Sequence, residues 1–340
     1  MNLSDLSPYL LYPFKSEQEL IRAIEELSLK FTQNRERIED YLKDPRLVSA
    51  YTAFYLTTNI PKLKAISNWL PKNWLDHLLK CDFIDLGAGP GTFSLAWKEF
   101  GGEGEFYQIE KSELMRDQAK KIWNGFYPHK MLQQSSNWNF KTHESFVLFG
   151  HSANEMGPKL AINYLQNIRP DHVLFLEPGT KTFFKDMLEI REYLIKEGYN
   201  IIFPCALSSE CPMKGNEDWC HQFIHVKQDS EVERLSQMAR KDRKLLPLTV
   251  HAFSKTFKQE ASAERVVRVH SETKFSFEWD VCHDNQLDHY QVMKRNLDKK
   301  SLSALSEVLS GDSIQTQSDK ELETYKRVKI TKINNYELKP

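Results

Sequence analysis

A glycine-rich turn between two hydrophobic segments has the spacing of a nucleoside-cofactor site. Residues 83–92 read FIDLGAGPGT, with an aspartate two places before the first of three alternating glycines. Glycine adopts backbone angles that other residues avoid and lets the main chain approach a ligand closely. The spacing differs from the Gly-x-Gly-x-x-Gly dinucleotide fingerprint, and an acid at this place is more typical of S-adenosylmethionine (SAM) sites. The predicted cofactor-binding residues here are Asp85, Leu86, Gly87, Ala88, Gly89 and Gly91.

Three polar residues farther along the chain complete this predicted site. Glu110 follows a strand-like segment about 20 residues after the turn, where an acid can bind ribose hydroxyls. Asn154 and Glu155 follow the strand-like segment 145–150, and they are candidates for binding substrate or cofactor. They are the leading catalytic candidates, whereas the nearby His151 is interpreted as a structural histidine rather than a base. An Asn-Glu pair before a helix is also an ordinary capping arrangement, so both interpretations stay open.

Four of the five cysteines have the spacing of a metal centre. Cys205, Cys211 and Cys220 crowd into one polar segment, separated by five and eight residues, and Cys282 stands apart. This spacing is looser than the two-residue knuckles of zinc fingers, and thiolates on a long loop suit an iron–sulfur cluster bound by four cysteines. We expect a strand over residues 274–281 to bring Cys282 back as the fourth ligand. If the metal is zinc, His221, His225 or His283 could replace some of the cysteines as ligands. The remaining interpretation is that the three loop cysteines are unrelated and bind no metal.

Alternating strands and helices from residue 82 to about residue 255 must position these groups. Strands are predicted at 82–86, 105–109, 145–150, 172–177, 199–203 and 247–254, and helices at 92–100, 112–124, 158–168 and 181–197. This alternation predicts an α/β fold with a mainly parallel sheet covered by helices. Ligands bind beyond the carboxyl ends of such strands. The glycine turn, residues 150–156 and residues 177–180 should therefore meet at one rim.

The two flanks of this region have different patterns. Residues 1–70 are predicted to be helical, with a break at Ile60-Pro61, and form one domain. A second domain covers residues 71–258 and carries the cysteine-rich loop 204–226. Residues 259–340 are predicted to form a small β-rich domain. Within it, strand-like runs at 265–270, 274–281 and 289–294 precede a short helix, a mobile polar segment at 313–320, and an edge strand or basic arm at 325–333.

Composition narrows the possible partners. The 340 residues include 46 basic and 47 acidic ones, so the chain has no global attraction to polyanions and any nucleic-acid surface must be local. The best local candidate is the basic stretch 234–244. No apolar run of about 18 residues exists, which excludes a predicted membrane span. Without a secretory or mitochondrial leader pattern, the expected location is the cytoplasm.

Four features together resemble one known family. They are the glycine turn, Asn154-Glu155, the segment Glu177-Pro178-Gly179-Thr180, and the cysteine–tryptophan segment 204–221 with the later Cys282. The chain resembles the small-ribosomal-subunit-associated methyltransferase-like proteins of mitochondria and bacteria (the Rsm-twenty-two type) over roughly residues 46–312. The glycine turn is shared by many methyltransferases, whereas the cysteine–tryptophan segment is specific.

The resemblance implies a fold, two cofactors and a partner. The implied fold is a Rossmann-like SAM-dependent methyltransferase domain with an N-terminal helical cap and a small C-terminal β-rich appendage. The implied cofactors are SAM and a 4Fe-4S cluster on Cys205, Cys211, Cys220 and Cys282. The implied partner is the small ribosomal subunit or its rRNA, without DNA or membrane. Three hypotheses follow: an rRNA methyltransferase, a non-catalytic assembly factor, and a small-molecule methyltransferase with structural zinc.

Overall fold

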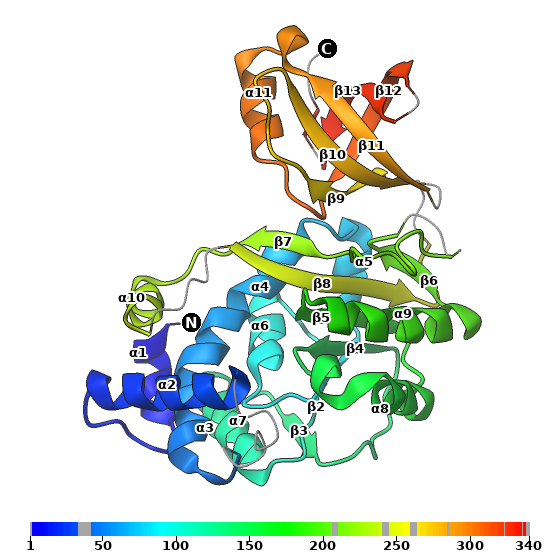
Figure 1. Cartoon of the computed structure of the whole chain (residues 1–340). Helices are drawn as coiled ribbons and strands as arrows, with labels where there is room; N and C mark the ends of the chain where they lie inside the picture. Colours follow the sequence, from blue (N-terminus) through cyan, green and yellow to red (C-terminus); the bar gives the residue numbers. More distant parts are fainter. Residues whose placement is uncertain are drawn as a thin grey trace.

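Two β-sheets organise the chain in the computed structural model, one drawn below the other in Figure 1. The structure describes residues 2–32, 42–205, 210–239, 245–258, 264–283, 286–322, 324–334 and 336–337. The first sheet contains β1 (Asp82–Leu86), β2 (Phe106–Ile109), β3 (Leu132–Ser135), β4 (Ser145–Gly150), β5 (His172–Pro178), β6 (Asn200–Phe203), β7 (Gln222–His225) and β8 (Leu245–Ser254). The second contains β9 (Glu264–Val269), β10 (Ser276–His283), β11 (Gln286–Met293), β12 (Ser313–Glu321), β13 (Lys326–Ile333) and β14 (Tyr336–Glu337).

The strand order of the first sheet is β3-β2-β1-β4-β5-β8-β6, with β7 paired to β8. Strands β1 to β5 are parallel to one another, and β8 runs antiparallel between β5 and β6. The order reverses between β1 and β4, which is the switch point where ligands bind in doubly wound sheets. This arrangement confirms the expected Rossmann-like α/β fold. The short strands β3 and β7 were not predicted, because their residues LQQS and QFIH lack a strong apolar pattern.

Helices cover both faces of this sheet, as buried parallel strands require. The α-helices of the described residues are α1 (Leu3–Leu6), α2 (Glu17–Thr32), α3 (Pro45–Tyr51), α4 (Thr57–Ser67), α5 (Lys72–Leu78), α6 (Thr92–Phe100), α7 (Glu113–Phe126), α8 (Ala153–Ile168), α9 (Lys181–Lys196), α10 (Ser230–Met238) and α11 (Lys299–Ser306). The last of them, α11, lies on the second sheet instead. All five residues of β1 are buried. One of its faces packs with α4 to α6 through Phe83, and the other contributes Ile84 to a cluster with α8 and α9.

The predicted break at Ile60-Pro61 is wrong, because α4 continues through Pro61. A π-helical turn at Thr52–Leu56 joins α3 to α4 just before the proline. Threonine hydroxyls donate to carbonyls in this region, including Thr57 Oγ1 to Ala53 O at 2.8 Å. The backbone hydrogen bond that Pro61 cannot donate is therefore missing at a place where the hydrogen-bond pattern of the helix is already irregular. Among the described residues, no helix has the length and apolar character needed to cross a bilayer.

The second sheet has the order β11-β10-β9-β12-β13-β14 and packs against α11. The predicted mobile segment at 313–320 is wrong, because these residues form most of β12. Its polar residues pair with β13, the strand expected at 325–333, so backbone pairing rather than side-chain burial defines it. Gly311 joins the two sheets: its φ is +106°, and a Cβ there would lie 2.8 Å from Gln222 Cγ and 3.1 Å from Trp69 Cζ2.

Candidate functional site

A cavity of about 780 Å³ opens at the carboxyl ends of β1, β2 and β4. Its size is within the range of small-molecule and cofactor sites. The lining residues are Leu42, Lys43, Leu86, Gly87, Ile109, Glu110, Lys111, Ser112, Glu113, Leu114, Ser152, Glu155, Met156, Leu160 and Tyr164. The cavity therefore lies at the switch point of the sheet, where the sequence placed its rim.

The glycine turn needs its glycines for two separate reasons. Gly87, Gly89 and Gly91 all have positive φ, at +72°, +53° and +84°. A Cβ on Gly87 would also lie 2.5 Å from Ser152 Cβ, so any larger residue would push α8 away from β1. The turn is thereby tight enough for backbone to form the floor of the cavity.

Asp85 lies beneath the turn and does not line the cavity. Its Oδ2 accepts hydrogen bonds from Ser94 N and Ser94 Oγ, both at 2.8 Å. Complete burial raises the pKa of Asp85 to about 7. The residue anchors α6 to the end of β1 and so fixes the path of the turn between them.

Glu110 reaches the cavity from the end of β2. Its Oε2 accepts from Gly89 N at 2.9 Å and its Oε1 accepts from Ser112 N at 2.8 Å. The two bonds tie the glycine turn to the start of α7 and hold the carboxylate in one orientation. A carboxylate at the end of the second strand, with lone pairs left over, suits a pair of hydroxyl donors.

Glu177, on β5, organises the start of α8. Its Oε1 accepts from Ser152 N at 3.0 Å and from Ala153 N at 2.8 Å, where the helix presents its positive end. Burial raises the pKa of Glu177 to about 8, against the lowering effect of these hydrogen bonds. In the amide orientation that its neighbours require, Asn154 Nδ2 donates to Glu177 Oε2 at 2.7 Å and to the His151 carbonyl at 3.1 Å.

The structure thus separates the two catalytic candidates. The Asn154 amide contacts Glu177 at an exposed position and is not among the lining residues, whereas Glu155 lines the cavity. Glu155 is exposed to solvent in the cavity wall, and the protein around its carboxyl displaces enough water to raise its pKa to about 7, with a further contribution from the charge of Glu110. Ser112, Met156 and Tyr164 also line the cavity and were not predicted, because nothing in their local sequence marks them.

A second cavity lies where the first sheet meets the second, and all four candidate cysteines line it. Cys205 follows β6, while Cys282 lies inside β10, which begins and ends two residues later than predicted. The other lining residues are Phe184, Leu188, Pro204, Cys211, Met213, Cys220, His251, Arg265 and Val267. All four cysteines are free thiols, and the alternative ligands His221, His225 and His283 are not among the lining residues.

The surroundings of these cysteines favour bound positive charge. Burial, followed by the charges of the other three cysteines, raises the pKa of the Cys220 thiol well above its usual range. Burial raises the pKa of Cys282 to about 12. Thiolates here therefore need a cation, and Arg265 is completely buried beside them. It donates to Pro204 O at 3.2 Å and to Gly311 O at 2.9 Å.

The spacing of the sulfur atoms helps to distinguish zinc from a larger cluster. Zinc–sulfur bonds of about 2.3 Å in a tetrahedron place the sulfurs about 3.8 Å apart. Among the described residues, the groups of three or more ligand atoms within 4.8 Å of one another include none of these four sulfurs. The structure therefore does not bring any three of these sulfurs to the mutual distances of a single-zinc site.

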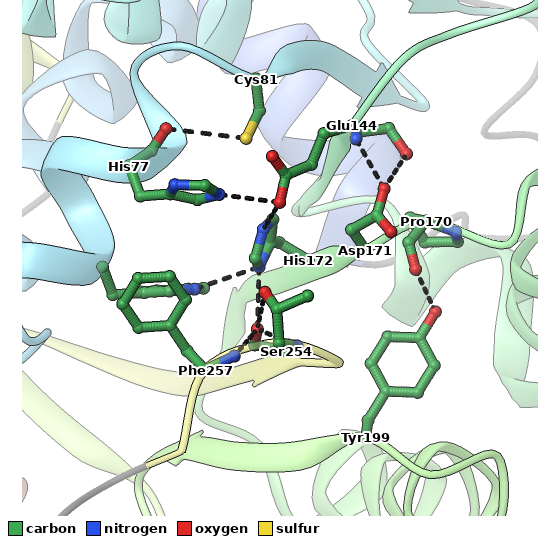
Figure 2. A network of polar contacts seen from close by, with 12 residues as sticks. His77, Cys81, Glu144, Pro170, Asp171, His172, Tyr199, Ser254 and Phe257 are labelled. Atoms are coloured by element: carbon green, nitrogen blue, oxygen red, sulfur yellow. Dashed lines mark hydrogen bonds and ion pairs between the residues drawn. The ribbon is translucent and has the colours of Figure 1, made fainter.

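A different set of metal-type side chains lies at the opposite edge of the first sheet (Figure 2). Ligand atoms of His77, Cys81, Glu144 and His172 all lie within 4.8 Å of one another. Glu144 Oε1 contacts His77 Nε2 at 2.8 Å and His172 Nε2 at 3.3 Å. The indole N–H of Trp74 donates to His172 Nδ1 at 3.2 Å, so the imidazole proton lies on Nε2 and faces Glu144. His172 Nε2 then has no lone pair for a metal, which leaves His77, Cys81 and Glu144 as the ligand-type groups of this network.

The basic stretch 234–244 is only partly described. Arg234, on α10, pairs with Glu17 at 2.6 Å. The remaining predicted basic residues of this stretch, Arg240, Lys241, Arg243 and Lys244, lie outside the described residues. The phosphate-binding role of the stretch stays a prediction.

The buried carboxyl groups predict a pH dependence of stability. Glu177 has a folded pKa of about 8 against an ordinary value of 4.5, so the folded state keeps a proton that the unfolded state releases. Stability should therefore fall as pH rises through this window, by roughly 3 kcal/mol between about pH 5 and pH 8. Urea unfolding followed by tryptophan fluorescence measures this slope.

Glu177→Gln removes this titrating group and leaves an amide oxygen to accept the N–H bonds, so the slope should become shallower. Asp85 and Glu155, whose pKa values are raised to about 7, should keep the rest of it. Glu103→Gln, at an exposed position, is the matched control and should keep it. Equal slopes in the wild type and in Glu177→Gln would show that Glu177 is ionised in the folded protein throughout this range.

Comparison with solved structures returns methyltransferases at low similarity. Magnesium protoporphyrin IX methyltransferase (ChlM) from Synechocystis PCC 6803 with bound SAM is 12% identical, with a TM-score of 0.37, over 72% of this chain and 100% of that chain. TrmK from M. capricolum with S-adenosylhomocysteine is 8% identical, with a TM-score of 0.33, over 56% and 72%. Ribosomal protein L11 methylase from Lactobacillus delbrueckii subsp. bulgaricus is 9% identical, with a TM-score of 0.31, over 41% and 71%. Scores at this level carry no argument about the fold, which rests on the strand order.

The family comparison is more informative. No curated protein matches the chain. A family model described as "Mitochondrial small ribosomal subunit Rsm22" matches residues 46–327, from the start of α3 into β13. This range includes the glycine turn, the rim residues and all four cavity cysteines. Because the match covers well over half of the sequence, the chain belongs to the Rsm22 family.

Proposed function

We propose that this protein binds SAM at the rim of its first sheet, carries a 4Fe-4S cluster, and acts on the small ribosomal subunit or its rRNA. Membership of the Rsm22 family over residues 46–327 is the observation that carries the proposal. The two cavities support it, because each is lined by the residue types that its proposed cofactor needs. A cytoplasmic location is part of the same proposal.

The first cavity supports SAM binding through its backbone floor and its acidic wall. Gly87 lets the main chain approach the ligand, and Glu110 is held in place to accept hydrogen bonds from the ribose hydroxyls. Asp85 lies beneath the glycine turn and holds it in place through its hydrogen bond with Ser94 N. Glu155 and Met156 lie at the end of the cavity formed by β4 and α8, where we place the methyl-donor end.

The second cavity supports a cluster bound by Cys205, Cys211, Cys220 and Cys282. Four thiolates supply the ligand set that 4Fe-4S clusters use, and Arg265 offsets part of the negative charge. A bound cluster would link the segment after β6 to β10 of the second sheet. Metal binding in such a place is coupled to folding, so the proposed role is structural.

The ribosomal part of the proposal follows from the family and from the charge balance. The net charge of the chain is −1, so RNA contact depends on local surfaces and on protein partners rather than on a global field. Methyl transfer needs mainly proximity and alignment of donor and acceptor. The rRNA methyltransferase is therefore the leading form of the proposal.

A non-catalytic assembly factor is the second candidate, and one observation favours it. The Asn154 amide is bound to Glu177 and to the His151 carbonyl, and does not face the cavity. Only Glu155 of the two catalytic candidates is left to contact an acceptor. A small-molecule methyltransferase with structural zinc is less well supported, because among the described residues no three of these sulfurs all lie within 4.8 Å of one another.

Binding of S-adenosylhomocysteine tests the first cavity. Glu110→Gln replaces a charged acceptor, so affinity should fall by about 10-fold to 100-fold, the cost of one or two hydrogen bonds to a charged group. Isothermal titration calorimetry measures the change. Glu113→Gln, which alters a neighbouring acid of the same cavity, should keep affinity within about threefold. An equal loss of affinity in both variants would show that Glu110 does not bind the ribose hydroxyls as proposed.

Cysteine substitutions test the second cavity. Wild-type protein purified without oxygen should contain about four iron and four sulfide per chain. Cys220→Ser and Cys282→Ser should lose most of both, and should also melt at a lower temperature because the link between the sheets is gone. Cys81→Ser, which alters the fifth cysteine far from the cavity, should retain the cluster. Stoichiometric zinc in place of iron would contradict the cluster assignment.

Crosslinking in cells tests the ribosomal assignment. The protein is crosslinked to RNA, purified under denaturing conditions, and the attached RNA is sequenced. Small-subunit rRNA should be enriched over large-subunit rRNA. Loss of methylation at the crosslinked site in a deletion strain would identify the enzyme, and unchanged methylation would identify the assembly factor. Absence of rRNA enrichment would count against both forms of the proposal.

A further inference from the structure

His251, on β8, is a buried polar residue without a hydrogen-bond partner among the described residues. Its side chain is 2% exposed. Within the described part of the chain, neither Nδ1 nor Nε2 has a hydrogen-bond partner. An unsatisfied buried polar group costs about 1–3 kcal/mol. Such a group calls for an explanation, and a missing ion or cofactor is one of the usual ones.

The position of His251 supplies this explanation, because it lines the same cavity as the four cysteines. The neighbouring wall is apolar and includes Phe184, Leu188 and Val267. Arg265 is the other polar group there, and it already donates to two carbonyls. Among the described residues that line the cavity, the cysteine sulfurs are therefore the side-chain acceptors for an imidazole N–H.

The imidazole is suited to donate one hydrogen bond. Burial, with a smaller contribution from Arg191, lowers the pKa of His251 to about 3. The ring is then neutral and carries one N–H and one lone pair. Its plane is also held from one side, since the His251 and Phe253 rings stack with centroids 6.1 Å apart and an interplanar angle of 18°.

We propose that the His251 N–H donates a hydrogen bond to a sulfur of the cluster held by the four cysteines, and thereby raises the reduction potential of that cluster. The inference rests on the cluster of the proposed function and adds one residue to it. Hydrogen bonds to cluster sulfurs are among the main determinants of cluster potential, because they stabilise the more negative, reduced form. His251 is thus a positioning and tuning residue, not a ligand.

The test measures the midpoint potential of the bound cluster in the full-length chain. Wild type, His251→Leu and His251→Gln are purified anaerobically, and iron and sulfide are counted. Each protein is then titrated with dithionite and followed by electron paramagnetic resonance. Thr249→Val is the matched control, because Thr249 is also on β8 and is 0% exposed, and its hydroxyl has no partner in the part of the chain that the structure describes, yet it does not line the cavity.

His251→Leu should keep its iron and shift the potential to more negative values by an amount equal to about a tenfold change in the equilibrium constant, or about 59 mV for one electron. His251→Gln retains an N–H donor and should shift by less than half of this. Thr249→Val should not shift. In deuterated buffer, pulsed resonance should detect an exchangeable proton coupled to the cluster in wild type and not in His251→Leu.

Two results would overturn the inference, and they are distinguishable. If the wild type holds the cluster while His251→Leu has the same potential and the same exchangeable coupling, His251 binds only a buried water. If no form of the protein retains iron and sulfide, the cluster of the proposed function fails and the inference fails with it. Thermal melting of each variant shows whether a shift reflects unfolding.

Discussion

Burial of the first sheet on both faces is the constraint on which the rest of the structure depends. Its central strands are enclosed by helices, so polar groups have no place along β1, β4 or β5 except at their ends. The carboxyl ends of parallel strands meet at one edge, and the helices that follow present their N–H groups there. Both cavities open along that edge. Their separate chemistries therefore follow from one arrangement of strands.

Buried carboxyl groups hold this edge together. Asp85 fixes the start of α6, and Glu177 fixes the start of α8, each through backbone N–H donors. Neither side chain touches the first cavity. They position the residues that do, Gly87 above Asp85 and Glu155 above Glu177. The opposite edge is organised in the same way by hydrogen bonds, with Glu144 between His77 and His172 (Figure 2).

The second cavity depends on the contact between the two sheets. Arg265, at the start of β9, reaches across to Pro204 O after β6 and to Gly311 O before β12. Its guanidinium also lies 4.5 Å from the centroid of the Phe203 ring, a cation–π contact. These contacts bring Cys282 to the three cysteines of the loop. The relative positions of the four thiols therefore depend on the contact between the two sheets as well as on the conformation of the loop.

The sequence by itself determined the α/β fold, most strands of the first sheet and the rim with its glycine turn, because apolar segments and glycine spacing are local signals. It did not reveal β12, whose polar residues are held by backbone pairing, or the continuous helix through Pro61. Only the tertiary structure decided that Asn154 turns away from the cavity and that His251 faces the cysteines. The physical reason is that the partners of these side chains come from segments that are distant in the sequence. A local sequence pattern does not show which distant segments will lie side by side.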